Sequence, residues 1–260
     1  ICKIGNAAIT IGTTPQQFLD ITTNRNRELI FFNESEQGVF KDCFFSPKEY
    51  ALVKRTAIKS INKWRRIEAI LSLGYAPADT SLEVLGKTIF DKDEDISYFS
   101  IIALSQTKDI SSAKILLDFF RKNSFCRYKI VSILETFPKE INSEVVKLLD
   151  AADPDLRLWA LRLLGALKSK DIEKIKKLLN DPVPEVRAAG CICLGKIGDK
   201  SLGGLLEERL SDNSWLVRIS AAKALSDILK DGCIPKVIRL INDGSLSVIN
   251  GLKGILAEHI

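Results

Sequence analysis

The stretch DPVPEVRAAGCICLGKIGD, residues 181–199, contains side chains that could do chemistry. Asp181 and Arg187 bring opposite charges six residues apart, and Cys191 and Cys193 bring thiols, which act as nucleophiles or metal ligands once they are deprotonated. Glycines bound the turn that follows. The stretch is therefore either a catalytic or metal-binding site, or a structural unit that recurs along the chain.

The rest of the chain lacks the partners that such chemistry requires. His259 is the single histidine, which removes histidine-based metal sites, histidine general bases, and Ser-His-Asp or Cys-His catalysis. No GxGxxG or GxxxxGK(S/T) motif is present to hold phosphates. We therefore predict no catalytic residue, no metal site and no cofactor, so that the protein is not an enzyme.

The cysteines and the hydropathy pattern indicate the compartment. None of the six cysteines forms a CxxC pair, and we predict that they are buried and reduced, as is usual for cytoplasmic proteins: Cys2, Cys43, Cys126, Cys191, Cys193 and Cys233. No apolar run approaches the roughly 20 residues that a membrane span needs, and no signal-peptide pattern opens the chain. We expect a cytoplasmic protein without a membrane span, although sequence outside this chain could still tether it.

The layout of residues 181–199 recurs on both sides. Thirty-one residues later, DNSWLVRISAAKALSDI begins at Asp212 and places Arg218 six residues after that Asp. Thirty residues earlier, DPDLRLWALRLLGAL places Arg157 at the position of Arg187. Self-similarity at a period of about 20–50 residues is typical of stacked-repeat proteins.

A recurring leucine marks the period most regularly. It returns at intervals of 30 or 31 residues, at Leu73, Leu104, Leu134, Leu164, Leu194, Leu225 and Leu256. Gly74, Gly165 and Gly195 follow it, where we expect them to end a helix in the left-handed conformation. A second apolar-periodic segment lies between successive markers, so each unit is predicted to be two helices, which must stack to bury their apolar faces.

The repeated segments resemble HEAT-like repeats of the phycobilisome-lyase type, whose consensus runs Asp…Val-Arg-x-x-Ala-Ala-x-Ala-Leu-Gly. Residues 181–195 and 212–226 match it well, 153–165 match it less closely, and the likeness extends over roughly residues 60–260. The resemblance implies an all-α fold, an α-solenoid of six to seven stacked helix pairs, and leaves function open. Deoxyhypusine hydroxylase, a HEAT-repeat enzyme, is set aside because its iron site needs several His-Glu pairs.

The N-terminal part of the chain does not follow the repeat. We divide the chain into a non-repeat segment, 1–45, which would cap the solenoid, and the repeats, 46–260. Within the segment, TTPQQFLDI (13–21) predicts a short helix, and residues 27–45 predict a β-hairpin. A helix should follow, with Ser46 and Glu49 as its capping box.

Both ends suggest a piece of a longer protein. The chain begins with Ile and contains no Met, and the last repeat stops after LSVINGLKGILAEHI. Modified methionines missing from the printed sequence would be a second explanation for the absence of Met.

One face of the marker helices is unexpectedly apolar. Core positions 186, 190, 193, 194 and 197 leave an opposite face that the resembling repeats turn toward a concave groove. The three Trp and three of the four Tyr residues fall on this face. We predict a partner-binding groove, because aromatic and Arg side chains dominate binding hot spots, lined by Trp64, Tyr98, Phe99, Phe125, Tyr128, Lys129, Leu158, Trp159, Arg162, Ile192, Trp215, Ile219 and Lys223. Packing against neighbouring helices is the alternative.

The Asp and Arg of the repeat have a structural interpretation. We predict that Asp181, Arg187, Asp212 and Arg218 form a ladder, in which Arg reaches turn carbonyls and the Asp of the next unit. The ladder should be interrupted where Ser97 and Ile249 replace Arg.

Three functions remain open at this point. The leading hypothesis is a non-catalytic scaffold that binds a protein or peptide segment in the aromatic groove. A bilin lyase is the first alternative. The second is a nucleic-acid binder of the HEAT-like alkylpurine DNA glycosylase type, with Trp159 beside Asp155 or Tyr98 beside Asp95. The net charge of +5 is spread along the chain, which argues against nucleic acid.

Overall fold

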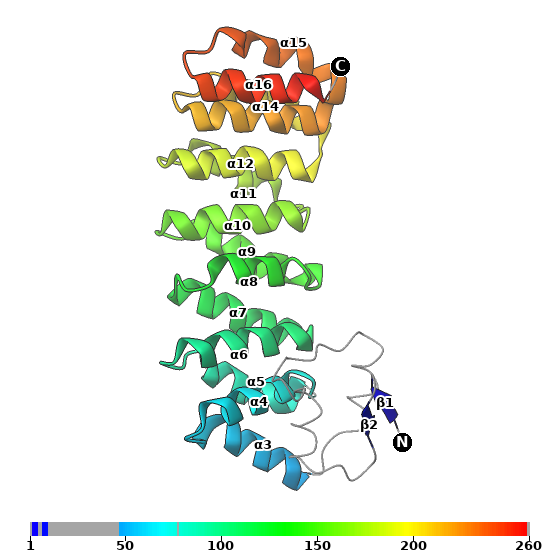
Figure 1. Cartoon of the computed structure of the whole chain (residues 1–260). Helices are drawn as coiled ribbons and strands as arrows, with labels where there is room; N and C mark the ends of the chain where they lie inside the picture. The colour runs from blue at the N-terminus through cyan, green and yellow to red at the C-terminus, as the bar shows by residue number, and fades with distance from the viewer. Residues whose placement is uncertain (1, 5–6, 10–46, 77, 259–260) are drawn as a thin grey trace. The chain divides into compact units, whose positions relative to one another are not determined.

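The computed structural model describes residues 2–4, 7–9, 47–76 and 78–258, and these divide between two compact units, Ile1–Pro138 and Lys139–Ile260 (Figure 1). Two short strands, β1 (Cys2–Ile4) and β2 (Ala7–Ile9), pair antiparallel with Cys2 opposite Ile9. The helix predicted for 13–21 and the hairpin predicted for 27–45 lie outside the described residues. The cap and the domain boundary at residue 45 stay predictions.

The first unit contains three antiparallel helix pairs within its described part. The helices are α3 (Pro47–Lys59), α4 (Lys63–Gly74), α5 (Ala78–Thr88), α6 (Glu94–Thr107), α7 (Ile110–Lys122) and α8 (Arg127–Leu134). In each pair we call the first helix A and the second helix B. The B helices α4 and α6 pack against one another, and their A helices cover the same side. The marker leucines Leu73, Leu104 and Leu134 are fully buried in this core.

The second unit contains four pairs, whose A helices are short and interrupted by 3₁₀ turns. These A segments are η1–α9–η2 (139–150), α11 (Ile172–Lys177) with η3 (Leu178–Asn180), η4–α13 (200–209), and η5–α15–η6 (230–242). The B helices are α10 (Pro154–Ala166), α12 (Pro184–Ile197), α14 (Trp215–Leu229) and α16 (Leu246–Ala257). They stack in chain order, so that α12 packs on α10 and α14, and α14 packs on α16 (Figure 1).

The seven pairs within residues 47–258 confirm the predicted all-α stack of six to seven repeats. The B helices begin at residues that are favourable at helix N-termini. The Asp153 carboxylate accepts the Asp155 amide at 2.9 Å, and Pro154 and Pro184 occupy first helical positions, where the missing N–H costs nothing. Pro47 likewise begins α3, as predicted.

The glycines after the markers have a different role from the one predicted. Gly74, Gly165 and Gly195 lie inside α4, α10 and α12 rather than in left-handed helix ends. A Cβ atom on Gly195 would come within 2.9 Å of Ala224, and one on Gly74 within 2.9 Å of Ala103. Glycine is therefore needed because successive B helices touch backbone to backbone here. The left-handed residue that ends α12 is Gly198, which follows the helix and has φ 81°.

Candidate partner-binding face

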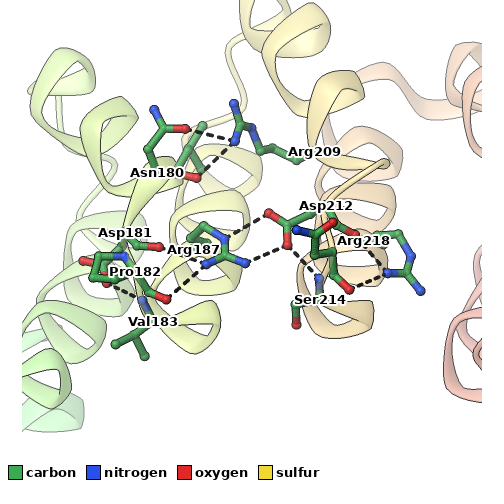
Figure 2. Close-up of polar contacts among 11 residues, drawn as sticks. Asn180, Asp181, Pro182, Val183, Arg187, Arg209, Asp212, Ser214 and Arg218 are labelled. Atoms are coloured by element: carbon green, nitrogen blue, oxygen red, sulfur yellow. Dashed lines mark hydrogen bonds and ion pairs between the residues drawn. The ribbon is translucent and has the colours of Figure 1, made fainter.

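The Asp–Arg pairs of the second unit form three linked rungs, and the middle one, Arg187 with Asp212, is drawn in Figure 2. Arg187 donates from Nε and Nη2 to the two carboxylate oxygens of Asp212, at 2.9 and 2.8 Å. Its Nη1 donates to the carbonyl oxygens of Asp181 and Pro182, at 2.9 and 3.4 Å. Each guanidinium therefore holds its own turn and the carboxylate of the following repeat in one planar contact.

The same geometry repeats one unit before and one unit after. Arg157 binds the Asp181 carboxylate at 2.7 and 3.0 Å, and Arg218 binds Asp243 at 2.7 Å through both nitrogens. The aspartates also accept backbone amides two residues on, as Asp181 does from Val183 at 2.9 Å. The structure thus brings the four predicted ladder residues together and adds Arg157 and Asp243 to them.

Two of the ladder carboxylates, Asp212 and Asp243, have lowered pKa values because guanidinium groups donate hydrogen bonds to them. The hydrogen bond from Arg218 lowers the pKa of Asp243 despite its partial burial. Burial acts most strongly on Asp212 and would raise its pKa, but Arg187 and the Ser214 amide together hold that pKa below its ordinary value. The hydrogen bond to Asp212 in turn raises the pKa of Arg187. These groups are ion-paired links between repeats.

One such rung lies in the described part of the first unit. Arg66 donates to Asp91 at 2.5 Å and to the Ala57 carbonyl at 3.1 Å. Where Arg is replaced by Ser97, as predicted for an interruption, the hydroxyl donates to the Ile89 carbonyl at 2.6 Å. The short side chain satisfies the turn but reaches no carboxylate of the next repeat.

Cys126, Cys191, Cys193 and Cys233 are free thiols. Cys191, Cys193 and Cys233 are buried, as predicted, whereas Cys126 is half-buried in a left-handed turn. Burial raises the pKa of Cys191 and of Cys193 to about 12, so both remain protonated. Among the residues described, no three His, Cys, Asp or Glu side chains come together as a metal site. No helix in that part of the chain is long and apolar enough to cross a membrane.

The predicted groove residues of the second unit all keep some exposure. Trp215 is 47% exposed on α14 and Ile192 is 37% exposed on α12. Arg162 is exposed on α10, and its guanidinium lies 4.6 Å from the ring centre of Trp159, which is half-buried. Lys223 is exposed, and Leu158 and Ile219 are half-buried. We call this surface of α10, α12, α14 and α16 the B face.

The corresponding residues of the first unit are described separately. Trp64 is 54% exposed on α4, and Tyr128 is 74% exposed on α8 beside the exposed Lys129. Tyr98 and Phe99 are half-buried on α6, with their rings edge to face and centroids 5.5 Å apart. The aromatic side chains therefore pack partly against each other.

Three details of the predicted face need correction. Phe125 lies in the turn before α8 rather than on that helix, because Cys126 adopts φ 56° and delays the helix start. The core positions predicted for residues 186–197 would leave Ala188 and Ala189 on the open face, but both are buried because α10 and α14 flank α12 on both sides. Asp95, suggested as a partner for Tyr98, is ion-paired with Lys63. The exposed strip of each B helix is narrower than the apolar pattern predicted.

Sequence reasoning missed one exposed side chain of the B face. Leu246, at the start of α16, is 76% exposed. It stands ten residues before the marker Leu256, just as Trp215 stands ten residues before Leu225. Applying the repeat position to the last unit would have found it.

Comparison with known proteins identifies the repeat. Residues 142–226 and 172–250 match the sequence profile described as HEAT repeats. The match to the HEAT profile lies within Lys139–Ile260, the unit that contains the linked rungs. No curated protein matches the chain in sequence.

Solved structures similar to this chain include HEAT- and armadillo-like repeat proteins. YIBA of E. coli is 18% identical, with 87% of this chain and 93% of that one covered and a TM-score of 0.46. Human deoxyhypusine hydroxylase is 15% identical, with 94% of each chain covered and a TM-score of 0.39. A designed armadillo repeat protein in complex with the peptide (KR)4 is 14% identical, with 82% and 100% covered and a TM-score of 0.37. These likenesses concern the fold alone.

Proposed function

We propose that the protein is a non-catalytic scaffold that binds a protein or peptide segment on the B face of the second unit. The observation that carries the proposal is that large apolar side chains stay exposed on three successive B helices: Trp215 and Leu246 in the first turns of α14 and α16, and Ile192 near the end of α12. Large apolar side chains exposed on one surface are unfavourable in water and are typical of partner surfaces. Trp159, stacked under Arg162, adds the residue types that most often anchor an interface.

The non-catalytic part of the proposal rests on how the reactive side chains are used. The carboxylates of Asp181, Asp212 and Asp243 bind guanidinium groups of the ladder. The thiols of Cys191 and Cys193 are buried and protonated. Protected thiols also suit a reducing compartment, so we propose a cytoplasmic location. The resemblance to repeats of the phycobilisome-lyase type concerns architecture, and we propose no bilin chemistry from it.

A paired capture experiment tests the proposal. Wild-type protein and a variant with Trp159→Ala and Trp215→Ala are used as baits, and bound proteins are identified by mass spectrometry. A matched control carries Ile238→Ala and Ile241→Ala, which remove exposed apolar side chains from the A segment η6 of the same unit. Circular dichroism verifies that all three are folded.

We expect at least one partner to bind the wild type and the control but to be lost from the B-face variant. Removing two partly buried Trp contacts should weaken binding by roughly 2–4 kcal/mol, enough to lose a micromolar partner on washing. Identical partners on all three baits would contradict the proposal and move binding to another surface.

A further inference from the structure

Cations occupy the same repeat position on alternate B helices. Arg162 on α10, Ile192 on α12 and Lys223 on α14 each stand two residues before the marker leucine and are exposed. Gly165 contacts Cys193 and Gly195 contacts Ala224, so the segments around the marker leucines of successive helices lie side by side, in the same register both times. Arg162, Ile192 and Lys223 therefore form one row across three helices, with the apolar side chain in the middle.

The cations of this row have no carboxylate partner among the described residues. Arg162 contacts Trp159, while Lys223 and the neighbouring Lys196 on α12 form no ion pair in the described part of the chain. The ladder uses Asp181, Asp212 and Asp243, and Glu207 pairs with Lys236. These four carboxylates are thus paired elsewhere and do not neutralise the row.

Carboxylates on the B face lie mainly at its edges. Asp155 and Glu185 belong to the first turns of α10 and α12, about two turns before the row. Asp227 lies one turn beyond Lys223, next to Gly195. A nucleic acid would bring phosphates close to these carboxylates at the edges, whereas a peptide can place its charges only where cations lie.

We propose that the occupant of the B face is an acidic, extended peptide segment that crosses α10, α12 and α14 along this row. Packed helices are about 8–10 Å apart and an extended chain advances about 3.3 Å per residue, so about three peptide residues correspond to each B helix. The partner then has acidic residues about six apart, facing Arg162 and Lys223, with an apolar residue midway over Ile192. This inference rests on the proposed function and specifies its ligand.

A displayed random-peptide library, selected on the full chain, tests the inference without a known partner. We expect enriched sequences to carry Asp or Glu on both sides of a central apolar residue. A fluorescently labelled synthetic copy of an enriched peptide is then titrated against the wild type and against Arg162→Glu with Lys223→Glu. Reversing both charges should weaken binding by about 10- to 100-fold, because each contact becomes repulsive.

The matched control is Lys174→Glu with Lys177→Glu, which makes the same charge change at exposed positions of the A helix α11. It should change the affinity less than about twofold, since exposed charges away from the contact are screened. Tighter binding of a labelled oligothymidylate than of the peptide, abolished by the same Arg162 and Lys223 reversal, would overturn the inference in favour of nucleic acid.

The remaining outcomes separate the inference from the proposed function. Enriched peptides without acidic residues, lost on Trp159→Ala with Trp215→Ala but kept on charge reversal, would overturn the acidic ligand and leave the scaffold intact. Enriched peptides that bind all B-face variants as well as the wild type, or no enrichment at all, would overturn both.

Discussion

The two units use the same helix-pair scaffold but join their repeats with different polar contacts. In the second unit, three bidentate Arg–Asp contacts link each repeat to the next. In the described part of the first unit, one Arg–Asp contact, Arg66 with Asp91, is followed by buried hydroxyl contacts. Ser100 donates to Thr88 of the same helix pair at 2.7 Å, and Thr107 donates to Ser112 of the next pair at 2.6 Å.

The apolar contacts between repeats also differ between the two units. The second unit brings B helices together through small residues such as Gly165 and Gly195. The first unit adds an aromatic contact between the turn after α5 and helix α7, with the rings of Phe90 and Phe119 5.3 Å apart. The fold itself requires only that turn carbonyls are satisfied and apolar faces covered, and Ser97 meets the first requirement as well as an Arg does.

Substitution of a marker leucine should have the largest effect on stability, and this effect should be similar in the two units. Leu104→Ala and Leu194→Ala each remove a fully buried side chain from a B helix. We expect each to lower the local free energy of unfolding by about 2–5 kcal/mol, through lost burial and the cavity left behind. Hydrogen exchange read separately over α6 and α12 measures the two values. A loss below about 1 kcal/mol in one unit would show that its core is packed differently.

Substitutions that remove polar contacts should destabilise the two units to different extents. Asp212→Asn breaks a bidentate ion pair and should cost about 2–3 kcal/mol over α12 and α14. Ser97→Ala leaves the Ile89 carbonyl without its buried donor and should cost about 1–2 kcal/mol over α6. Hydrogen exchange over the same helices reports both, and Asp199→Asn, in an exposed turn of the second unit, is a control expected to have a smaller effect. Equal losses for Asp212→Asn and Ser97→Ala would remove the distinction between ladder and hydroxyl contacts.

The smallest expected effect is on how the stability of the protein depends on pH. Arg218 lowers the pKa of Asp243 in the folded state, so this pair stabilises the protein above the unfolded pKa, about 3.9. That stability is lost as the pH falls from about 4 through the lowered folded pKa. Between pH 6 and pH 3, the wild type should therefore lose more unfolding free energy than Asp243→Asn, which has no proton to gain. Urea unfolding at several pH values measures both; parallel curves would show that the pair contributes nothing.

Much of the fold could be predicted because its signals are local and repeat. The marker leucines predicted the period and the buried side of each B helix. The six-residue spacing of Asp and Arg predicted which carboxylate each guanidinium reaches. The glycine role was predicted wrongly, since a glycine near a helix end has the same sequence signature whether it turns the chain or admits a neighbouring helix. Phe125 was misplaced because the helix start depends on the backbone of Cys126.

The candidate site was predicted less completely than the fold. All the predicted groove residues described here keep some exposure, but Ala188 and Ala189 do not, and Leu246 was overlooked. The groove and its partner remain proposals.

The sequence by itself determined the period, the pairing of helices and the residues of the ladder, because these follow from spacing along one chain. Only the tertiary structure decided which strip of each B helix stays open to a partner. Exposure depends on the helices packed on both sides, as α10 and α14 flank α12, and these neighbours are about 30 residues away in sequence. The row of Arg162, Ile192 and Lys223 became visible only once the backbone contacts had set the register between helices.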